Sequence, residues 1–125
     1  MKILIVDDSL MDRKLLMNLL KKNSIENEVL QAADGEEGLK VLSAAYKDIC
    51  LILLDWQMPK MSGIDFMRAV VKVPETSSIP IIMITASASE ENKKLAKEVN
   101  PQLAAYIVKP YKPETLLGII RPYVK

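Results

Sequence analysis

Four short apolar runs, separated by longer amphipathic segments, constrain the fold of this 125-residue chain more than any other feature. They lie at residues 3–6, 49–54, 80–84 and 104–108, and each is rich in branched side chains and too short for a helix. Such runs are typical of strands that are buried on both faces of a parallel sheet. A fifth segment, residues 28–31, is more polar, which predicts a strand at an edge of the sheet.

The segments between these runs have the three- and four-residue spacing of amphipathic helices. The apolar stripes are Met11, Leu15, Leu16, Leu19 and Leu20 in the first helix, Leu39, Leu42 and Tyr46 in the second, and Ile64, Met67 and Val71 in the third.

The last two helices differ from the first three. A fourth helix at residues 89–99 has few apolar residues among many charged ones, so weak anchoring predicts a movable element. The fifth should start with Pro113 at its first position and end or bend near Pro122, which lacks the N–H that would bond to Gly118. The expected inward residues are Leu95, Ala96 and Val99 in the fourth helix and Leu116, Leu117 and Ile120 in the fifth.

Strands and helices therefore alternate five times, which predicts a parallel sheet covered by helices on both faces, with right-handed crossovers. The expected fold class is α/β: a flavodoxin-like, doubly wound (βα)5 sheet in a three-layer sandwich. The polar second strand suits the strand order 2-1-3-4-5, although the full order is borrowed from known folds of this kind. The length fits a single domain, residues 1–125, and leaves no room for a second.

Composition excludes several classes of function. Half of the residues are apolar, and 17 Lys and Arg nearly balance 16 Asp and Glu, which argues against disorder and against a nucleic-acid-binding surface. With no histidine in the chain, His-based triads, His metal sites and phosphohistidine carriers are excluded. Cys50, the only cysteine, lies in an apolar run, which predicts a buried thiol and a reducing compartment, with the cytoplasm as the expected location. Asp7 and Asp8 interrupt the first apolar run, so we expect neither a signal peptide nor membrane insertion.

The residues that end the central strands are the most informative ones. Asp7 and Asp8 follow the first strand, Asp55 the third, Thr85 the fourth and Lys109 the fifth. Because the carboxyl ends of parallel strands share one edge of a sheet, these residues should converge into one candidate site.

Each of these residues also has an ordinary structural interpretation. Asp8 or Ser9 could cap the first helix, Thr85 could be a loop hydroxyl and Lys109 a solvated charge. Asp55 is harder to explain in this way, because it follows six apolar residues at the end of the strand expected to be most buried.

Electrostatics favours the collective interpretation. Carboxylates about 4 Å apart repel by roughly 4 kcal/mol at an effective dielectric constant near 20, so a cluster of them needs a cation. Carboxylates without His or Cys favour a hard, oxygen-seeking ion, Mg²⁺ above all, with Mn²⁺ as an alternative. A site with Mg²⁺, a lysine and a Thr hydroxyl suits phosphoryl transfer, and an Asp carboxylate can act as the nucleophile to give an acyl phosphate. Asp55 is the best placed nucleophile.

An ordered set of motifs resembles the response-regulator receiver domains of two-component signalling and covers essentially the whole chain. The motifs are ILIVDDS at residues 3–9, LLDWQMP at residues 53–59 with Gly63, ITA at residues 84–86 and KP at residues 109–110.

The resemblance implies a role for each residue of the site. Asp55 would accept a phosphoryl group from a phosphohistidine of a partner kinase or from a small phosphodonor. Asp8, Asp55 and the backbone carbonyl of Gln57 would bind Mg²⁺ directly, and Asp7 would bind it through water. The groups expected to contact the phosphoryl oxygens are the side chains of Thr85 and Lys109 and the backbone N–H groups of Trp56 and Ala86.

The resemblance also implies a switch and its partners. Tyr106 matches an aromatic position that moves inward when Thr85 engages the phosphoryl group, although it could also be a plain half-buried strand aromatic. The output would be a shift of the surface formed by the fourth helix, fifth strand and fifth helix, toward an unknown protein target. The expected phosphodonor partner is a sensor histidine kinase or a histidine phosphotransfer protein. Family precedent suggests a cis Lys109–Pro110 peptide bond.

The sequence departs from the family pattern before the fifth strand and has variable residues at two positions near the site. The glycine usual before the fifth strand is replaced by the segment at residues 100–104, and Gln57 and Ser87 occupy variable positions that tune hydrolysis in the family.

A phosphohydrolase of the haloacid-dehalogenase kind would need a second Asp where Gln57 stands. A flavodoxin-like electron carrier is disfavoured because Asp7 and Asp8 would repel the flavin phosphate. The complete acidic set argues against a receiver that only binds partners. We therefore expect a stand-alone, chemotaxis-type regulator or phosphorelay intermediate rather than an enzyme.

Overall fold

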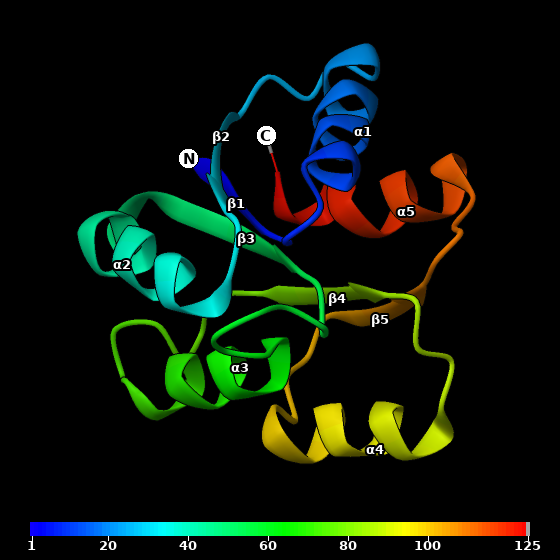
Figure 1. Cartoon of the computed structure of the whole chain (residues 1–125). Helices are drawn as coiled ribbons and strands as arrows, with labels where there is room; N and C mark the ends of the chain where they lie inside the picture. Colours follow the sequence, from blue (N-terminus) through cyan, green and yellow to red (C-terminus); the bar gives the residue numbers. More distant parts are fainter. Residues whose placement is uncertain (125) are drawn as a thin grey trace.

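The fold is a five-stranded parallel sheet with helices on both faces. A computed structural model describes residues 1–124, and Lys125 of the expected domain lies outside the described residues. The strands are β1 (Lys2–Val6), β2 (Glu28–Ala32), β3 (Ile49–Leu54), β4 (Ile81–Thr85) and β5 (Ala105–Val108), paired in the order β2-β1-β3-β4-β5 (Figure 1). The helices are α1 (Leu10–Lys22), α2 (Gly35–Ala45), α3 (Gly63–Lys72), α4 (Glu90–Val99) and α5 (Pro113–Ile120), with short 3₁₀ turns at Tyr46–Asp48 and Arg121–Tyr123. The predicted fold class and strand order are confirmed, and every predicted strand boundary lies within one residue of the observed one.

Alternating side chains of the strands divide the interior into two cores. Helices α1 and α5 cover one face of the sheet, and α2, α3 and α4 cover the other (Figure 1). In β1, Ile3 and Ile5 pack toward α1 and α5, whereas Leu4 and Val6 pack toward α2 and α3. Because both faces are covered, the central strands are apolar except at Lys2, which starts β1, and Thr85, which ends β4, and this explains their continuous apolar runs.

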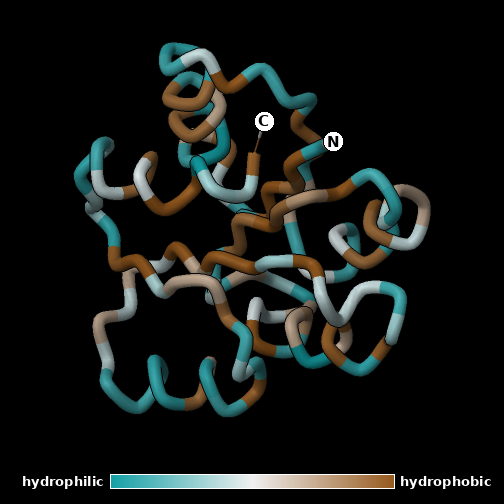
Figure 2. Tube along the Cα trace, turned by 180° about the vertical axis from the view of Figure 1, so that it is seen from behind, coloured by the Kyte–Doolittle hydropathy of each residue, from teal (hydrophilic) through white to brown (hydrophobic). Residues whose placement is uncertain are grey.

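Exposure explains the two segments with the most polar sequences. Strand β2 pairs only with β1 and forms one edge of the sheet, as its polar sequence predicts. In α4 only Ala96 is fully buried, with Leu95 and Val99 packed partly against the core, and the tube of this helix is mostly hydrophilic in Figure 2. The predicted weak anchoring of α4 is therefore observed.

Local signals set the helix ends. The side chains of Ser9, Asp34, Ser62 and Ser89 each accept a hydrogen bond from the backbone N–H three residues later and so cap α1 to α4. Pro113 occupies the start of α5, and this helix gives way to a 3₁₀ turn at the segment containing Pro122, as predicted.

Two predictions of burial were wrong. Met11 and Leu15 are 70% and 56% exposed, because α1 contacts the sheet mainly through a seam formed by Leu16 and Leu20, and only the last member of the neighbouring row, Leu19, packs partly against the core. The Cys50 thiol is only half-buried, and the polar Asn27 side-chain amide lies 3.8 Å from its sulfur.

The seam of α1 gives a matched pair of variants. We expect Leu20→Ala to lower the free energy of unfolding by about 2–5 kcal/mol, because it leaves a cavity beneath the helix. Leu15→Ala, on the same helix but exposed, should change it by about 0.5 kcal/mol or less. Urea denaturation followed by circular dichroism measures both, and equal losses would contradict this account of the packing.

Candidate functional site

Backbone hydrogen bonds at the strand ends bring the predicted site residues to one edge of the sheet. The Asp55 N–H donates to the carbonyl of Val6 at 2.9 Å, which places Asp55 beside Asp7. The Lys109 N–H donates to the carbonyl of Thr85 at 2.8 Å, which ties the ends of β5 and β4 together. Regular pairing of parallel strands is therefore sufficient to gather residues that are far apart in the sequence.

Three carboxylates form a cluster at this edge. Asp7, Asp8 and Asp55 each place one oxygen within 4.8 Å of the other two. Asp7 is buried, and its Oδ1 accepts a hydrogen bond from the Ser9 N–H at 2.9 Å. Of the two candidate caps of α1, Asp8 and Ser9, the structure confirms Ser9. Asp8 is exposed, and none of the residues at 1–124 donates a hydrogen bond to its side chain.

Asp55 is held between a donor, a cation and its acidic neighbours. Its Oδ1 accepts a hydrogen bond from the Trp56 N–H at 2.7 Å, and its Oδ2 lies 3.7 Å from the Lys109 Nζ. Burial raises the pKa of Asp55 above its ordinary value, Lys109 acts in the opposite direction, and Asp7 raises it further. In this structure the Trp56 N–H bonds to the carboxylate itself.

Lys109 is paired, not solvated. Its Nζ lies 2.7 Å from Asp12 Oδ2, 3.1 Å from Asp7 Oδ2 and 3.7 Å from Asp55 Oδ2. Burial lowers its pKa, but the hydrogen bond to Asp12 and the charges of Asp55 and Asp7 outweigh burial and raise the pKa well above the ordinary lysine value. The solvated-charge interpretation of Lys109 is therefore wrong.

Sequence reasoning missed Asp12 and Arg13. Asp12 lies four residues before Leu16 and eight before Leu20, on the buried row of α1. An acidic residue at the helical spacing of the inward residues could have indicated its role in the site. Arg13 donates from its guanidinium to the carbonyl of Asp7 and from Nε to Gln31 Oε1 at 3.0 Å. It thereby fastens the turn that carries the acidic pair to β2.

The loop after β3 folds tightly back on Asp55. The Gly63 N–H donates to the Trp56 carbonyl at 2.7 Å, and a Cβ at Gly63 would lie 2.0 Å from the Asp55 carbonyl oxygen. Only glycine fits at this point. The Gln57 carbonyl, predicted as a metal ligand, accepts no hydrogen bond from any residue that the structure describes.

Thr85 is connected to α4 and β5 through Ser87. Thr85 is buried, and its Oγ1 accepts a hydrogen bond from the Ser87 N–H at 3.3 Å. The hydroxyl of Tyr106, which is half-buried, donates to the Ser87 carbonyl at 2.9 Å, and Asn92 of α4 donates to Ser87 Oγ at 2.8 Å. Ser87 therefore forms a hydrogen-bonded junction between Thr85, Asn92 of α4 and Tyr106 of β5. Sequence reasoning did not predict this role. Ala86, the small residue between Thr85 and Ser87, is exposed.

The loop before β5, which lacks the usual glycine, is held by hydrogen bonds of Asn100. Asn100 is buried, donates its N–H to the Ala96 carbonyl, and accepts from the Gln102 N–H at 3.1 Å through its side chain. An amide side chain in this position thus stabilises the turn. The Lys109–Pro110 peptide bond at the other end of β5 is cis.

The donor set fits a divalent metal ion. It consists of carboxylate oxygens, one of them on an exposed and uncommitted side chain, and oxygen ligands of this kind suit Mg²⁺ or Mn²⁺. A cation among them would also relieve the mutual repulsion of the three carboxylates.

The sequence matches the response regulator receiver domain over residues 3–121. This chain belongs to that family. The receiver is 36% identical over 116 residues to the chemotaxis protein CheY1 of Helicobacter pylori, covering 93% of this chain and 90% of that protein. It also resembles the structure of CheY4 of Vibrio cholerae, with a TM-score of 0.85, 35% identity and 98% of both chains covered.

A further neighbour contains a metal ion and a protein partner. The CheX–CheY complex with BeF₃ and Mg²⁺ from Borrelia burgdorferi has a TM-score of 0.83 and 30% identity, covering 99% of the receiver and 90% of that chain.

Over residues 1–124 of the receiver, none of the helices is both long and apolar enough to cross a membrane.

The raised pKa of Asp55 predicts that the free energy of unfolding depends on pH. In metal-free buffer at pH 7, Asp55→Asn should raise the free energy of unfolding by about 1 kcal/mol, because it removes a desolvated carboxylate beside Asp7 and Asp8. Since folding raises the Asp55 pKa above its ordinary value of 3.8, wild-type stability should fall as pH rises through the folded-state pKa, a loss that Asp55→Asn lacks. Urea titrations between about pH 4 and pH 8 measure this difference. Parallel pH profiles for the two proteins would contradict it, and the exposed Asp65→Asn serves as the control.

Proposed function

We propose that this receiver accepts a phosphoryl group on Asp55 from a phosphohistidine of a sensor histidine kinase or a histidine phosphotransfer protein. The observation that carries the proposal is the meeting of three carboxylates with Lys109 at one edge of the sheet, with Asp55 at the end of a fully apolar strand. The function is signalling: the receiver would promote its own phosphorylation and dephosphorylation and transform no other substrate.

The transfer step needs little beyond positioning and charge. An oxygen of Asp55 forms a bond to phosphorus as the bond between phosphorus and the donor's imidazole nitrogen breaks. Lys109 would contact the transferred oxygens, together with the Thr85 hydroxyl and the N–H groups of Trp56 and Ala86. The bound divalent ion would neutralise charge on the phosphoryl oxygens.

The contacts in the acidic cluster support a division of labour among its members. Both Asp7 oxygens are engaged, one by the Ser9 N–H and the other by Lys109, which suits a ligand that acts through water. Asp8 is free, which suits direct coordination of Mg²⁺ with Asp55 and the Gln57 carbonyl. Mn²⁺ would use the same oxygen ligands.

The contacts of Ser87 support a switch that runs from Thr85 to Tyr106. If Thr85 turns toward the phosphoryl group, its hydrogen bond with the Ser87 N–H changes, and the Ser87 carbonyl carries that change to the Tyr106 hydroxyl. The weakly anchored α4 is bonded to the same junction through Asn92. The surface of α4, β5 and α5 would therefore shift its affinity for a protein target.

The similarity to chemotaxis proteins suggests the setting. Because the CheY proteins of Helicobacter pylori and Vibrio cholerae align with nearly the whole receiver, we propose a chemotaxis-type regulator that acts in the cytoplasm and binds proteins, without direct contact to nucleic acid or insertion into a membrane.

Trp56 adjoins Asp55 and offers a direct assay. Mg²⁺ should change its fluorescence, and acetyl phosphate with Mg²⁺ should change it further, because both ligands would bind within contact of Asp55. The second change should vanish in Asp55→Ala, and mass spectrometry should find one phosphoryl group on the wild type alone. Fluorescence that is indifferent to both additions would refute the proposal.

Lys109 should matter for the phosphoryl group and not for the metal. Lys109→Ala should keep Mg²⁺ binding largely intact and slow phosphorylation by acetyl phosphate by roughly a hundredfold, the usual effect of removing a preorganised positive contact. Lys112→Ala, an exposed lysine on the same connection, is the matched control and should behave as wild type. Normal phosphorylation of Lys109→Ala would remove this lysine from the mechanism.

A further inference from the structure

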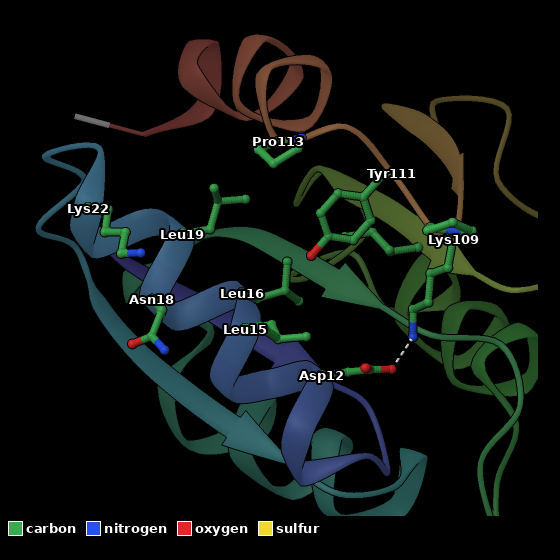
Figure 3. A pocket seen from close by; sticks show the side chains of 11 residues that line it. Asp12, Leu15, Leu16, Asn18, Leu19, Lys22, Lys109, Tyr111 and Pro113 are labelled. Atoms are coloured by element: carbon green, nitrogen blue, oxygen red, sulfur yellow. Dashed lines mark hydrogen bonds and ion pairs between the residues drawn. The ribbon is translucent and has the colours of Figure 1, made fainter.

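The shortest ion pair of Lys109 is made with Asp12, not with the phosphoacceptor. The Lys109 ammonium donates hydrogen bonds to Asp12 Oδ2 at 2.7 Å and to Asp7 Oδ2 at 3.1 Å. Asp55 Oδ2, at 3.7 Å, is too far away for a hydrogen bond. Figure 3 shows Asp12 projecting from α1 toward the end of the Lys109 side chain. The Lys109 charge, which a phosphoryl group on Asp55 would need, is thus already paired with the Asp12 carboxylate of α1.

Asp12 lies on the solvent side of the cluster. Its side chain is 36% exposed, compared with 12% for Asp55 and 4% for Asp7. It lines a hollow of about 580 Å³ between α1 and the start of α5, opposite Tyr111 (Figure 3). Asp12 is also absent from the group of carboxylates that can share a metal ion, so its contact with Lys109 is separate from the metal site.

We propose that Asp12 is a positioning residue that competes with the phosphoryl group for Lys109. The inference rests on the proposed function and goes beyond it, because it names a residue that restrains phosphorylation. While Asp55 carries no phosphoryl group, Asp12 holds the ammonium on the side of α1. When an anion sits on Asp55, the ammonium is shared between two negative partners, and each weakens the other's hold.

A purely structural role makes a different prediction. If the ion pair only fastened α1 to β5, its loss would destabilise the fold and weaken every ligand of the site. Competition predicts the opposite sign for the phosphoryl group alone. Beryllofluoride with Mg²⁺ is a suitable probe, because it occupies the phosphoryl position without a covalent bond and gives an equilibrium constant.

The experiment titrates beryllofluoride at saturating Mg²⁺ and follows Trp56 fluorescence, each variant first being titrated with Mg²⁺ alone. Asp12→Asn should bind beryllofluoride about threefold to tenfold more tightly than the wild type, the size expected when a half-exposed charge-assisted contact no longer competes. Asp12→Glu keeps the carboxylate and should restore wild-type affinity. Asp65→Asn, an exposed acid in the first turn of α3, should leave the affinity unchanged.

A double-mutant cycle tests whether the effect passes through Lys109. The gain from Asp12→Asn should disappear when Lys109→Ala is already present. A gain that persists there would overturn the proposal, since it would reflect only the general loss of a negative charge. Unchanged or weaker binding by Asp12→Asn alone would overturn it as well.

The two proposals fail in different ways. A wild type that binds Mg²⁺ and beryllofluoride but is insensitive to Asp12→Asn retains the proposed function and loses this inference. A wild type that gives no response to beryllofluoride with Mg²⁺ overturns both.

Discussion

The mutual repulsion of three neighbouring carboxylates at one edge of the sheet is the constraint on which the rest of the site depends. Asp7, Asp8 and Asp55 are brought together by strand pairing that the two hydrophobic cores impose, not by any attraction among them. Lys109 supplies the compensating charge within the chain. Burial, with the charges of Asp7 and Asp8, raises the pKa of Asp55, and the acidic partners of Lys109 raise its pKa against the effect of burial. A chain that keeps such a cluster gives up stability for a set of oxygen ligands that suits a divalent cation.

The surrounding contacts hold this unfavourable cluster in place. Arg13 fixes the turn that carries Asp7, and the absence of a side chain at Gly63 lets the loop after β3 close against the Asp55 carbonyl. Both contacts are made through the backbone, so they define the positions of the acids without neutralising them. Within the chain, Lys109 alone of the described residues pairs with both Asp7 and Asp55, and a divalent metal ion at the three carboxylates would supply further positive charge.

Much of the fold and of the site could be predicted from the sequence, because apolar runs and strand-end residues follow one-dimensional rules. The strands, their order and the convergence of the acidic residues with Lys109 fall in this class. Helix faces were less predictable: Leu15 fits the apolar period of α1 as well as Leu16 does, and only the narrow contact with the sheet separates them. The roles of Asp12 and Ser87 were not predicted, because they depend on contacts with the Lys109 ammonium and the Tyr106 hydroxyl. These partners are distant in the sequence, and no local motif indicates them.

The alternation of side chains along β4 and β5 sends the two side chains expected on the phosphoryl group toward different layers. Met83 and Tyr106 pack with the core beneath α4, and Thr85, two residues after Met83, connects to α4 through Ser87. Ile107 packs with the core beneath α1 and α5, and Lys109, two residues later, reaches Asp12 of α1. A phosphoryl group that drew on both Thr85 and Lys109 would therefore perturb both faces of the sheet at once, through a hydroxyl junction on one side and an ion pair on the other. The geometry of parallel strands would thus give the proposed phosphorylation two separate routes to the surface.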